Sequence, residues 1–129
     1  MPLPERYRVP PATADAVNAT RAAGRRVVAV GTTVTRALET VADAAGLVHA
    51  GEGWTDLVLG PDRPARVVDG LVTGWHEPEA SHLLLLEAVA GRRLVRRAYA
   101  AAVERGYLWH EFGDVCVLLP DRRSARRRG

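Results

Sequence analysis

Apolar residues along this chain alternate between helical spacing and short continuous runs. Residues 27–30 form a valine-rich run that ends at Gly31, a pattern typical of a buried parallel strand. Residues 13–23 before this run and residues 32–45 after it have helical spacing, and a glycine follows each segment. One of the two threonines at the start of the second segment is expected to cap that helix. Helix, strand, turn and helix in this order predict an open α/β sheet.

The second half of the chain continues with strands and helices. Its short β-branched runs predict further strands: residues 55–59, 67–68, 71–73 and 115–119. Helices are predicted over residues 79–89 and 93–105, each followed by a glycine. The predicted fold class is therefore α/β, with an open, mostly parallel sheet and flanking helices in a layered α/β/α arrangement.

The length and composition predict one globular domain. The chain has 129 residues, of which 47% are hydrophobic and 26% charged, as in ordinary folded proteins. Residues 1–11 contain four prolines and are expected to form an extended N-terminal arm. Residues 12–120 are expected to form the single α/β domain, which leaves residues 121–129 as a tail.

The positive charge is concentrated in that tail. All 18 basic residues are arginines, and five of them lie in the last eight residues, so residues 1–121 have a net charge of −2. Residues 121–129 are predicted to be a disordered Arg-rich tail. Such a tail can hold a polyanion through phosphate contacts, but a short solvated terminus is the simpler interpretation. The high isoelectric point is thus no argument for a nucleic-acid surface on the folded body.

The sequence indicates a cytoplasmic protein without a metal site. The first residues lead into no apolar stretch of the kind that a signal peptide requires, and no membrane contact is expected. The single cysteine, Cys116, excludes an internal disulfide and lies in an apolar run, where a small buried hydrophobe is expected. The four histidines lack metal-ligand spacing, so no metal is predicted.

The turn after the valine run is the first candidate site. Gly31 permits a tight turn and the close approach of a ligand. The N–H groups of the following helical turn, with the hydroxyls of Thr32 and Thr33, suit an anion or a polar oxygen. Ligands of open α/β sheets bind beyond the carboxyl ends of strands, where this turn lies. Arg36 either faces the same ligand or lies on the surface. A simple capped connection between strand and helix has the same sequence features, so the motif alone establishes no site.

A histidine loop and three aspartates are further candidates. His76 lies in the loop of residues 74–78 and can carry a proton near neutral pH, or it is a hydrogen-bonded structural residue. Asp56, Asp69 and Asp114 follow predicted turns. Each can be a general base or a ribose ligand, and each can equally be a turn-forming residue. Their spacing singles out no catalytic pair.

Five blocks of this sequence resemble the C-terminal half of the S-adenosylmethionine:tRNA ribosyltransferase-isomerase family, in the order in which the family has them. The blocks are residues 26–39 (RVVAVGTTVTRALE), Gly53-Trp54-Thr55-Asp56, residues 67–71 (VVDGL), His76 with Pro78, and Phe112-Gly113-Asp114. The similarity extends from about Glu5 to Leu119. The N-terminal portion of the family and its small β-barrel domain have no counterpart here.

The resemblance implies a reaction in queuosine biosynthesis. Family members transfer and isomerise the ribosyl moiety of S-adenosylmethionine onto 7-aminomethyl-7-deazaguanine in tRNA, which forms epoxyqueuosine and releases adenine and methionine. A sulfonium acidifies its neighbouring C–H groups, so one positioned base can start this rearrangement. S-adenosylmethionine would be a co-substrate, with no permanently bound cofactor, and tRNA a partner. By position, the binding residues would be Gly31, Thr32, Thr33 and Arg36, and the catalytic candidates His76, Asp56, Asp69 and Asp114.

This chain departs from the family pattern in the histidine loop. The family usually reads NFHLPKSTL where residues 74–82 read GWHEPEASH. Glu79 replaces a lysine and so reverses a charge near a polyanionic substrate, which would weaken RNA affinity. Gly74 removes an amide side chain beside His76.

These departures and the short length leave two alternatives to an active transferase and isomerase. The first is a non-catalytic, truncated nucleoside-binding module derived from the family. The second is a remnant that folds only with a partner, either a separate N-terminal half or a second copy. Half of a fold is expected to leave an open sheet edge or an apolar face.

Overall fold

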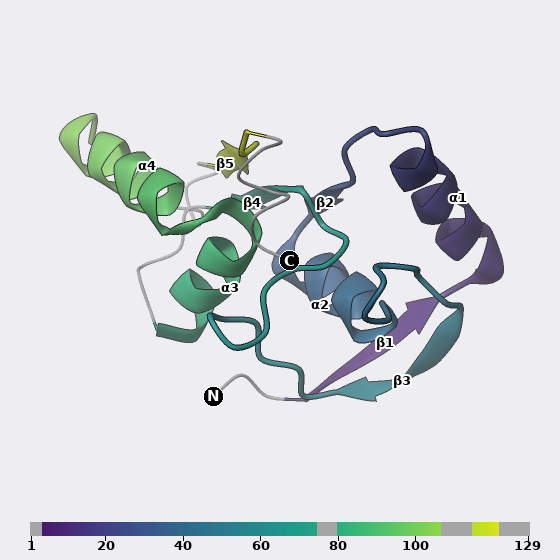
Figure 1. The fold of residues 1–129 in the computed structure, drawn as a ribbon. Helices are drawn as coiled ribbons and strands as arrows, with labels where there is room; N and C mark the ends of the chain where they lie inside the picture. The colour runs from purple at the N-terminus through teal and green to yellow at the C-terminus, as the bar shows by residue number, and fades with distance from the viewer. Residues whose placement is uncertain (1–3, 75–79, 107–114, 122–129) are drawn as a thin grey trace.

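Helices and strands are interspersed along the chain, in agreement with the α/β prediction. The computed structural model describes residues 4–74, 80–106 and 115–121. Its elements, drawn in Figure 1, are β1 (Glu5–Val9), α1 (Pro11–Ala22), β2 (Val28–Val30), α2 (Thr32–Thr40), β3 (Gly51–Thr55), β4 (Gly70–Gly74), α3 (Ala80–Ala90), α4 (Arg92–Glu104) and β5 (Val115–Leu118).

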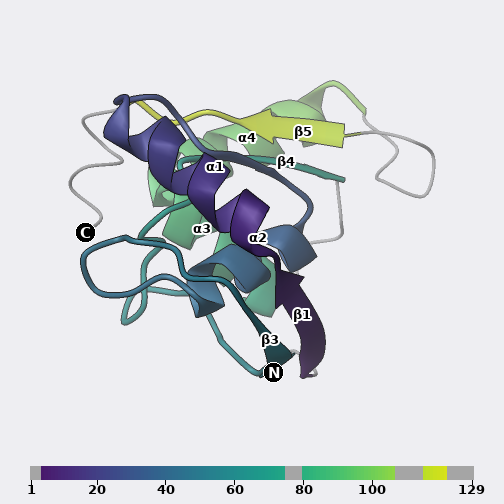
Figure 2. The same cartoon turned by 90° about the vertical axis from the view of Figure 1, so that its right-hand side faces the viewer.

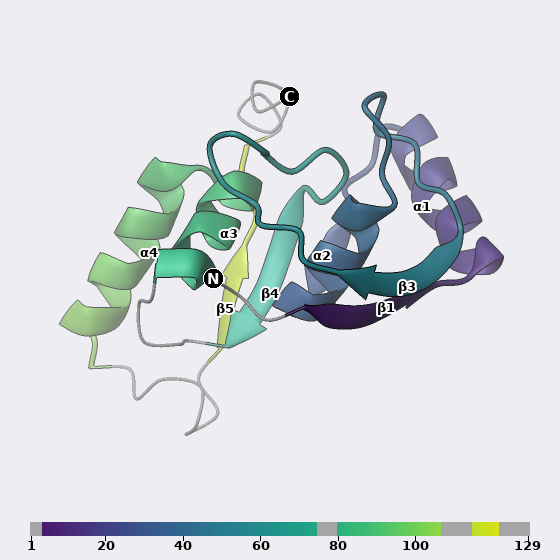
Figure 3. The ribbon, with the colours of Figure 1, turned by 90° about the horizontal axis from the view of Figure 1, so that it is seen from below.

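The described strands form two sheets. β1 and β3 make an antiparallel ribbon in which Glu5 lies opposite Thr55. β2, β4 and β5 make the second sheet, where β2 and β4 are parallel and β4 and β5 antiparallel. The prediction of a mostly parallel sheet is therefore wrong, because only one of these three pairings is parallel. The connection between β4 and β5 contains two helices, α3 and α4, which carry the chain away and back again (Figure 3), so β5 enters the sheet from the end where β4 left it.

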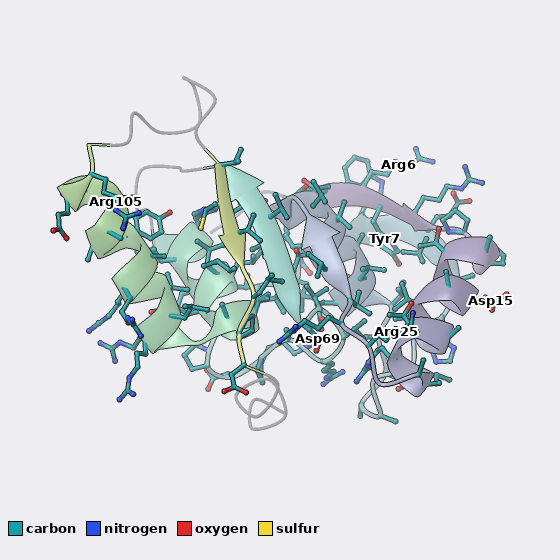
Figure 4. All side chains as sticks on the ribbon, turned by 90° about the horizontal axis from the view of Figure 1, so that it is seen from above. Arg6, Tyr7, Asp15, Arg25, Asp69 and Arg105 are labelled. Carbon is teal, nitrogen blue, oxygen red and sulfur yellow. The ribbon has the colours of Figure 1, made fainter. Side chains whose placement is uncertain are left out.

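The helices that contact the three-stranded sheet lie on one of its faces. α2 contacts β2 and β4, and α3 contacts β4 from the same side, with α4 packed on α3. Figure 2 shows α2 and α3 together beneath β4 and β5, and Figure 4 shows the opposite face with no described helix in front of it. Within the described ranges the fold thus lacks the second helical layer that an α/β/α arrangement requires.

Helix α2 starts and ends differently from its prediction. Its N-cap is Gly31, and no side chain caps its first turn, so the expected threonine cap is wrong. It ends at Thr40, five residues earlier than expected. The Asp43 carboxylate accepts hydrogen bonds from the N–H groups of Ala45 and Leu47, both at 3.0 Å. This side-chain turn competes with helical hydrogen bonding and breaks the helix.

Buried Glu39 explains why residues 67–68 are not a strand. The side chain is completely buried, and its carboxylate accepts the N–H groups of Arg66 at 2.7 Å and of Val67 and Val68 at 2.9 Å. The Arg63 guanidinium lies 3.3 Å from the same carboxylate. The N–H groups that a strand would give to its neighbour are therefore used by α2, and β4 begins only at Gly70.

Part of the predicted N-terminal arm is a strand. Residues 5–9, predicted as part of an extended arm, are extended but form β1 of the ribbon. The strand predicted over residues 55–59 lies earlier, at residues 51–55, where it pairs with β1.

The predicted tail lies outside the described residues apart from Asp121. In the described part of the chain, no helix is long and apolar enough to cross a membrane.

Candidate functional site

The threonine turn has an open approach. Gly31 has φ 97° and ψ 153°, a conformation that favours glycine. Its N–H donates to the Val72 carbonyl at 2.8 Å, which continues the β2–β4 ladder up to the point where the chain turns. A Cβ atom at Gly31 would meet no atom within 4 Å. The backbone conformation, and not crowding, therefore requires glycine at this position.

This turn borders a small pocket of about 110 Å³. The pocket lies between the starts of α2 and α3, the segment after β3 and the start of β1. Its lining residues are Glu5, Thr32, Arg36, Leu57, Val58, Leu59, Ser81, His82 and Leu85. The first turn of α3 and the threonine turn therefore reach the same pocket.

Arg36 is buried beside the pocket and is not a surface residue. It is 4% exposed, and its Nε donates to the Leu57 carbonyl at 3.1 Å. Its guanidinium also forms an ion pair with Glu5. The second carboxylate oxygen of Glu5 accepts the Thr33 hydroxyl at 2.9 Å. Thr33 therefore orients Glu5, whereas Thr32 and Arg36 line the pocket.

The aspartates do not gather at this pocket. Asp69 accepts the Val27 N–H at 3.0 Å and donates its own N–H to the Val27 carbonyl at 2.8 Å. This contact joins the amino ends of β2 and β4, at the opposite end of the strands from Gly31 (Figure 4). Asp56 is exposed and directly precedes Leu57 of the pocket wall. His76 and Asp114 lie outside the described residues.

Three polar pocket residues were not among the sequence candidates. The sequence could have indicated Ser81 and His82 as site candidates, because they lie in the first turn of the helix that follows the histidine loop. No sequence feature indicated Glu5, because its position depends on the pairing of β1 with β3. The apolar wall of residues 57–59 was predicted as a strand and is instead an irregular segment.

The two clear pKa shifts by burial lie away from the pocket. Burial raises the pKa of the Cys116 thiol, which is 8% exposed. Burial also raises the pKa of Tyr99, with a smaller contribution from Cys116. The thiol is therefore mostly protonated near neutral pH, and Cys116 is a buried core residue as predicted.

The pocket combines groups that suit a nucleoside. The hydroxyls of Thr32 and Ser81 and the Glu5 carboxylate can hydrogen-bond sugar hydroxyls. Arg36 can attract an anionic group, and the leucine side chains can pack against a base. The imidazole of His82 can donate or accept a hydrogen bond. Among the described residues, no group of three or more His, Cys, Asp or Glu side chains is placed to hold a metal.

Comparisons with known proteins connect this chain to one family. A model of the family described as "Queuosine biosynthesis protein" matches residues 2–118. The S-adenosylmethionine:tRNA ribosyltransferase-isomerase of Moorella thermoacetica is 50% identical over 115 residues, which are 89% of this chain and 34% of the relative. The protein of the same name from Geobacter sulfurreducens is 48% identical over the same shares.

A crystal structure supports the relationship. The S-adenosylmethionine tRNA ribosyltransferase of Thermotoga maritima superimposes with a TM-score of 0.72 at 41% identity, over 87% of this chain and 40% of that one. The chain thus spans about a third of the length of the curated relatives that it matches. The sequence match covers most of the chain and the structural match includes the same region, so this chain belongs to the queuosine biosynthesis protein family.

Proposed function

We propose that this chain provides part of the S-adenosylmethionine site of a tRNA ribosyltransferase-isomerase. The observation that supports the proposal most is the shared pocket, in which Thr32 and Arg36 of α2 meet Ser81 and His82 of α3. These two segments are far apart in the sequence. Thr32 and Arg36 lie within a block that resembles the family, and Ser81 and His82 follow the block of His76 and Pro78. The matching relatives carry the name of this activity.

In this proposal the sugar of S-adenosylmethionine lies against the threonine turn. Thr32 and Ser81 hydrogen-bond the ribose, and Arg36 attracts the carboxylate of the methionine part. His76 removes a proton from the carbon next to the sulfonium, which starts transfer of the ribosyl group to the deazaguanine base in tRNA. Adenine and methionine leave. Asp56 and Asp114 remain further catalytic candidates, and Asp69 is the weakest because its carboxylate accepts the Val27 N–H.

The size of the pocket favours an incomplete site. Its volume of about 110 Å³ is below the roughly 300–1,000 Å³ typical of pockets for drug-sized ligands. S-adenosylmethionine is of that size class, so this pocket holds only a part of it. The remaining walls would come from the two thirds of the relatives that this chain does not match.

The ribbon of β1 and β3 offers RNA a contact surface next to the pocket. Trp54 is 71% exposed, and Arg6 lies directly opposite it across the two strands. An exposed indole can stack on an unpaired base, and an arginine beside it can contact phosphate. Glu5, the neighbour of Arg6, lines the pocket from the other face of the ribbon, so RNA held by Trp54 and Arg6 would lie across the ribbon from the pocket.

The alternative is a nucleoside-binding module without catalysis. Glu79 and Gly74 depart from the family loop around His76, and the two thirds of the relatives that this chain does not match would hold part of the catalytic site. Both candidate functions use the same pocket. They differ in whether bound S-adenosylmethionine reacts.

Calorimetric titration with S-adenosylmethionine tests the pocket itself. We expect binding by the wild-type chain and at least about 5-fold weaker binding by Thr32→Ala, since one hydrogen bond contributes roughly 1 kcal/mol. Thr20→Ala is the matched control, because the Thr20 hydroxyl is exposed on α1 and bonds only the Ala16 carbonyl among the described residues. Equal affinity in Thr32→Ala and Thr20→Ala would contradict the proposed site.

Release of adenine separates the enzyme from the binding module. The chain is incubated with S-adenosylmethionine and precursor tRNA, alone and together with the unmatched part of the Moorella relative. The enzyme proposal expects adenine release that His76→Ala abolishes and that His49→Ala preserves, since His49 lies on an exposed turn with Asp43. Binding without release in either mixture would favour the module.

A further inference from the structure

One face of the three-stranded sheet is apolar, and no described helix covers it (Figure 4). On β2 and β5, the large side chains that point away from α2 and α3 are exposed. They are Val28 at 41%, Val30 at 68%, Val115 at 63% and Val117 at 56%, with Leu119 at 49% just beyond β5. Val30, Val72 and Val117 lie side by side across β2, β4 and β5. We call this surface of β2, β4 and β5 the open face.

The opposite face of the same strands is buried. Ala29, Leu71, Cys116 and Leu118 alternate with the open-face residues, and each is at most 8% exposed. Neither β2, β4 nor β5 contains a charged residue. Exposed strands of soluble proteins usually carry charges or prolines that prevent association, so this sheet is built to be covered on both faces.

We propose that the open face binds polypeptide, namely the portion of the family fold that this chain does not match. The chain corresponds to 34% of the Moorella relative and 40% of the Thermotoga structure, so about two thirds of the family fold is available to cover this face. Sheets with parallel pairs normally have helices on both faces, and only one face has described helices here (Figure 4). The occupant is thus an element with an apolar side, either earlier in the same polypeptide or in a separate one.

Co-expression tests this contact directly. A tagged form of the unmatched part of the Moorella relative is produced together with this chain. The molar mass of the purified complex is then measured by light scattering. We expect a one-to-one complex with the wild type. Val30→Asp and Val117→Asp should each lower the recovered complex at least about 10-fold, because each buries a charge among apolar groups.

Val103→Asp is the matched control. Val103 is 68% exposed, the same as Val30, but it lies on α4 and not on the open face. The proposal is supported if Val103→Asp forms the complex and Val30→Asp does not. Equal recovery with both variants would overturn it. A homodimer of this chain that Val30→Asp dissolves, with no complex formed, would assign the face to a second copy and would also overturn it.

A fusion protein covers the case in which the separate partner does not fold. The unmatched part of the relative is joined to this chain in the order of the relative, and thermal unfolding is measured. Val30→Asp is expected to lower the melting temperature by at least about 4 °C, and Val103→Asp by less than about 1 °C. Equal shifts would overturn the proposal. Neither readout depends on catalysis, so this inference and the proposed function can fail independently.

Discussion

Helices α2 and α4 begin in the same way and differ in what surrounds them. The residues before them, Gly31 and Gly91, have φ of 97° and 86° and ψ of 153° and 150°, and neither helix has a side-chain cap. A Cβ atom on either glycine would meet no atom within 4 Å. Yet only the start of α2 borders the candidate pocket.

The two helices differ in whether their polar side chains are buried. α2 buries three of them: Thr35, Arg36 and Glu39. α4 buries only apolar residues, and it presents four arginines to solvent, Arg92, Arg93, Arg96 and Arg97. None of these four forms an ion pair with a residue in the described ranges. A glycine-started helix is therefore not a site by itself, and the site arises where other elements bring partners to it.

The largest expected difference between these helices concerns their glutamates. Glu39→Ala should lower the free energy of unfolding by about 3–5 kcal/mol, because three backbone N–H groups and Arg63 lose their buried acceptor. Glu104→Ala, on the exposed side of α4, should change it by less than about 0.5 kcal/mol. Urea denaturation measures both. Similar losses in the two variants would show that the Glu39 carboxylate does not hold residues 66–68.

Substitution of either glycine by alanine should lower the stability by a similar amount, but only the substitution at Gly31 should weaken ligand binding. Gly31→Ala and Gly91→Ala should each cost about 1–3 kcal/mol of stability, since both backbones adopt a conformation nearly restricted to glycine. Only Gly31→Ala should weaken binding of S-adenosylmethionine, because it alone distorts the pocket. Thermal unfolding and calorimetry at the same temperature make the comparison. Unchanged affinity in Gly31→Ala would remove the threonine turn from the site.

The smallest expected effect lies just beyond the end of α2. The hydrogen bond from His49 and the backbone N–H of Leu47 lower the pKa of Asp43. Because the folded pKa is lowered, the stabilisation is present above the unfolded value of about 3.9 and is lost as pH falls through the folded pKa. Between pH 5.5 and 3, the urea midpoint should therefore fall slightly more for wild type than for Asp43→Asn. Parallel changes in the two proteins would contradict this assignment.

Several features were predictable from local sequence. α1, α3 and α4 lie within one or two residues of their predicted bounds, because apolar spacing and a following glycine mark them. The strand at residues 27–30 was also located, but its burial was not. Val28 and Val30 are exposed because no described helix covers their face, and the identity of a strand does not reveal how many of its faces are covered.

The candidate site was predictable only in part. Thr32 and Arg36 were recognised because the turn follows a strand directly, and both line the pocket. Glu5 and His82 reach the same pocket from segments 27 residues before Thr32 and 50 residues after it. No local sequence pattern predicts that these distant segments lie at one pocket, because this depends on the register of β1 with β3 and on the packing of α3.

Short-range signals in the chain thus located most helices and strands, the glycine at the start of α2 and the apolar character of β2 and β5. Long-range packing decided the direction of β5, the inward position of Arg36 and Glu39, and the single covered face of the sheet. The physical reason is that spacing and turn residues act over a few positions. Sheet order and burial depend on contacts between segments that the chain brings together only when it folds.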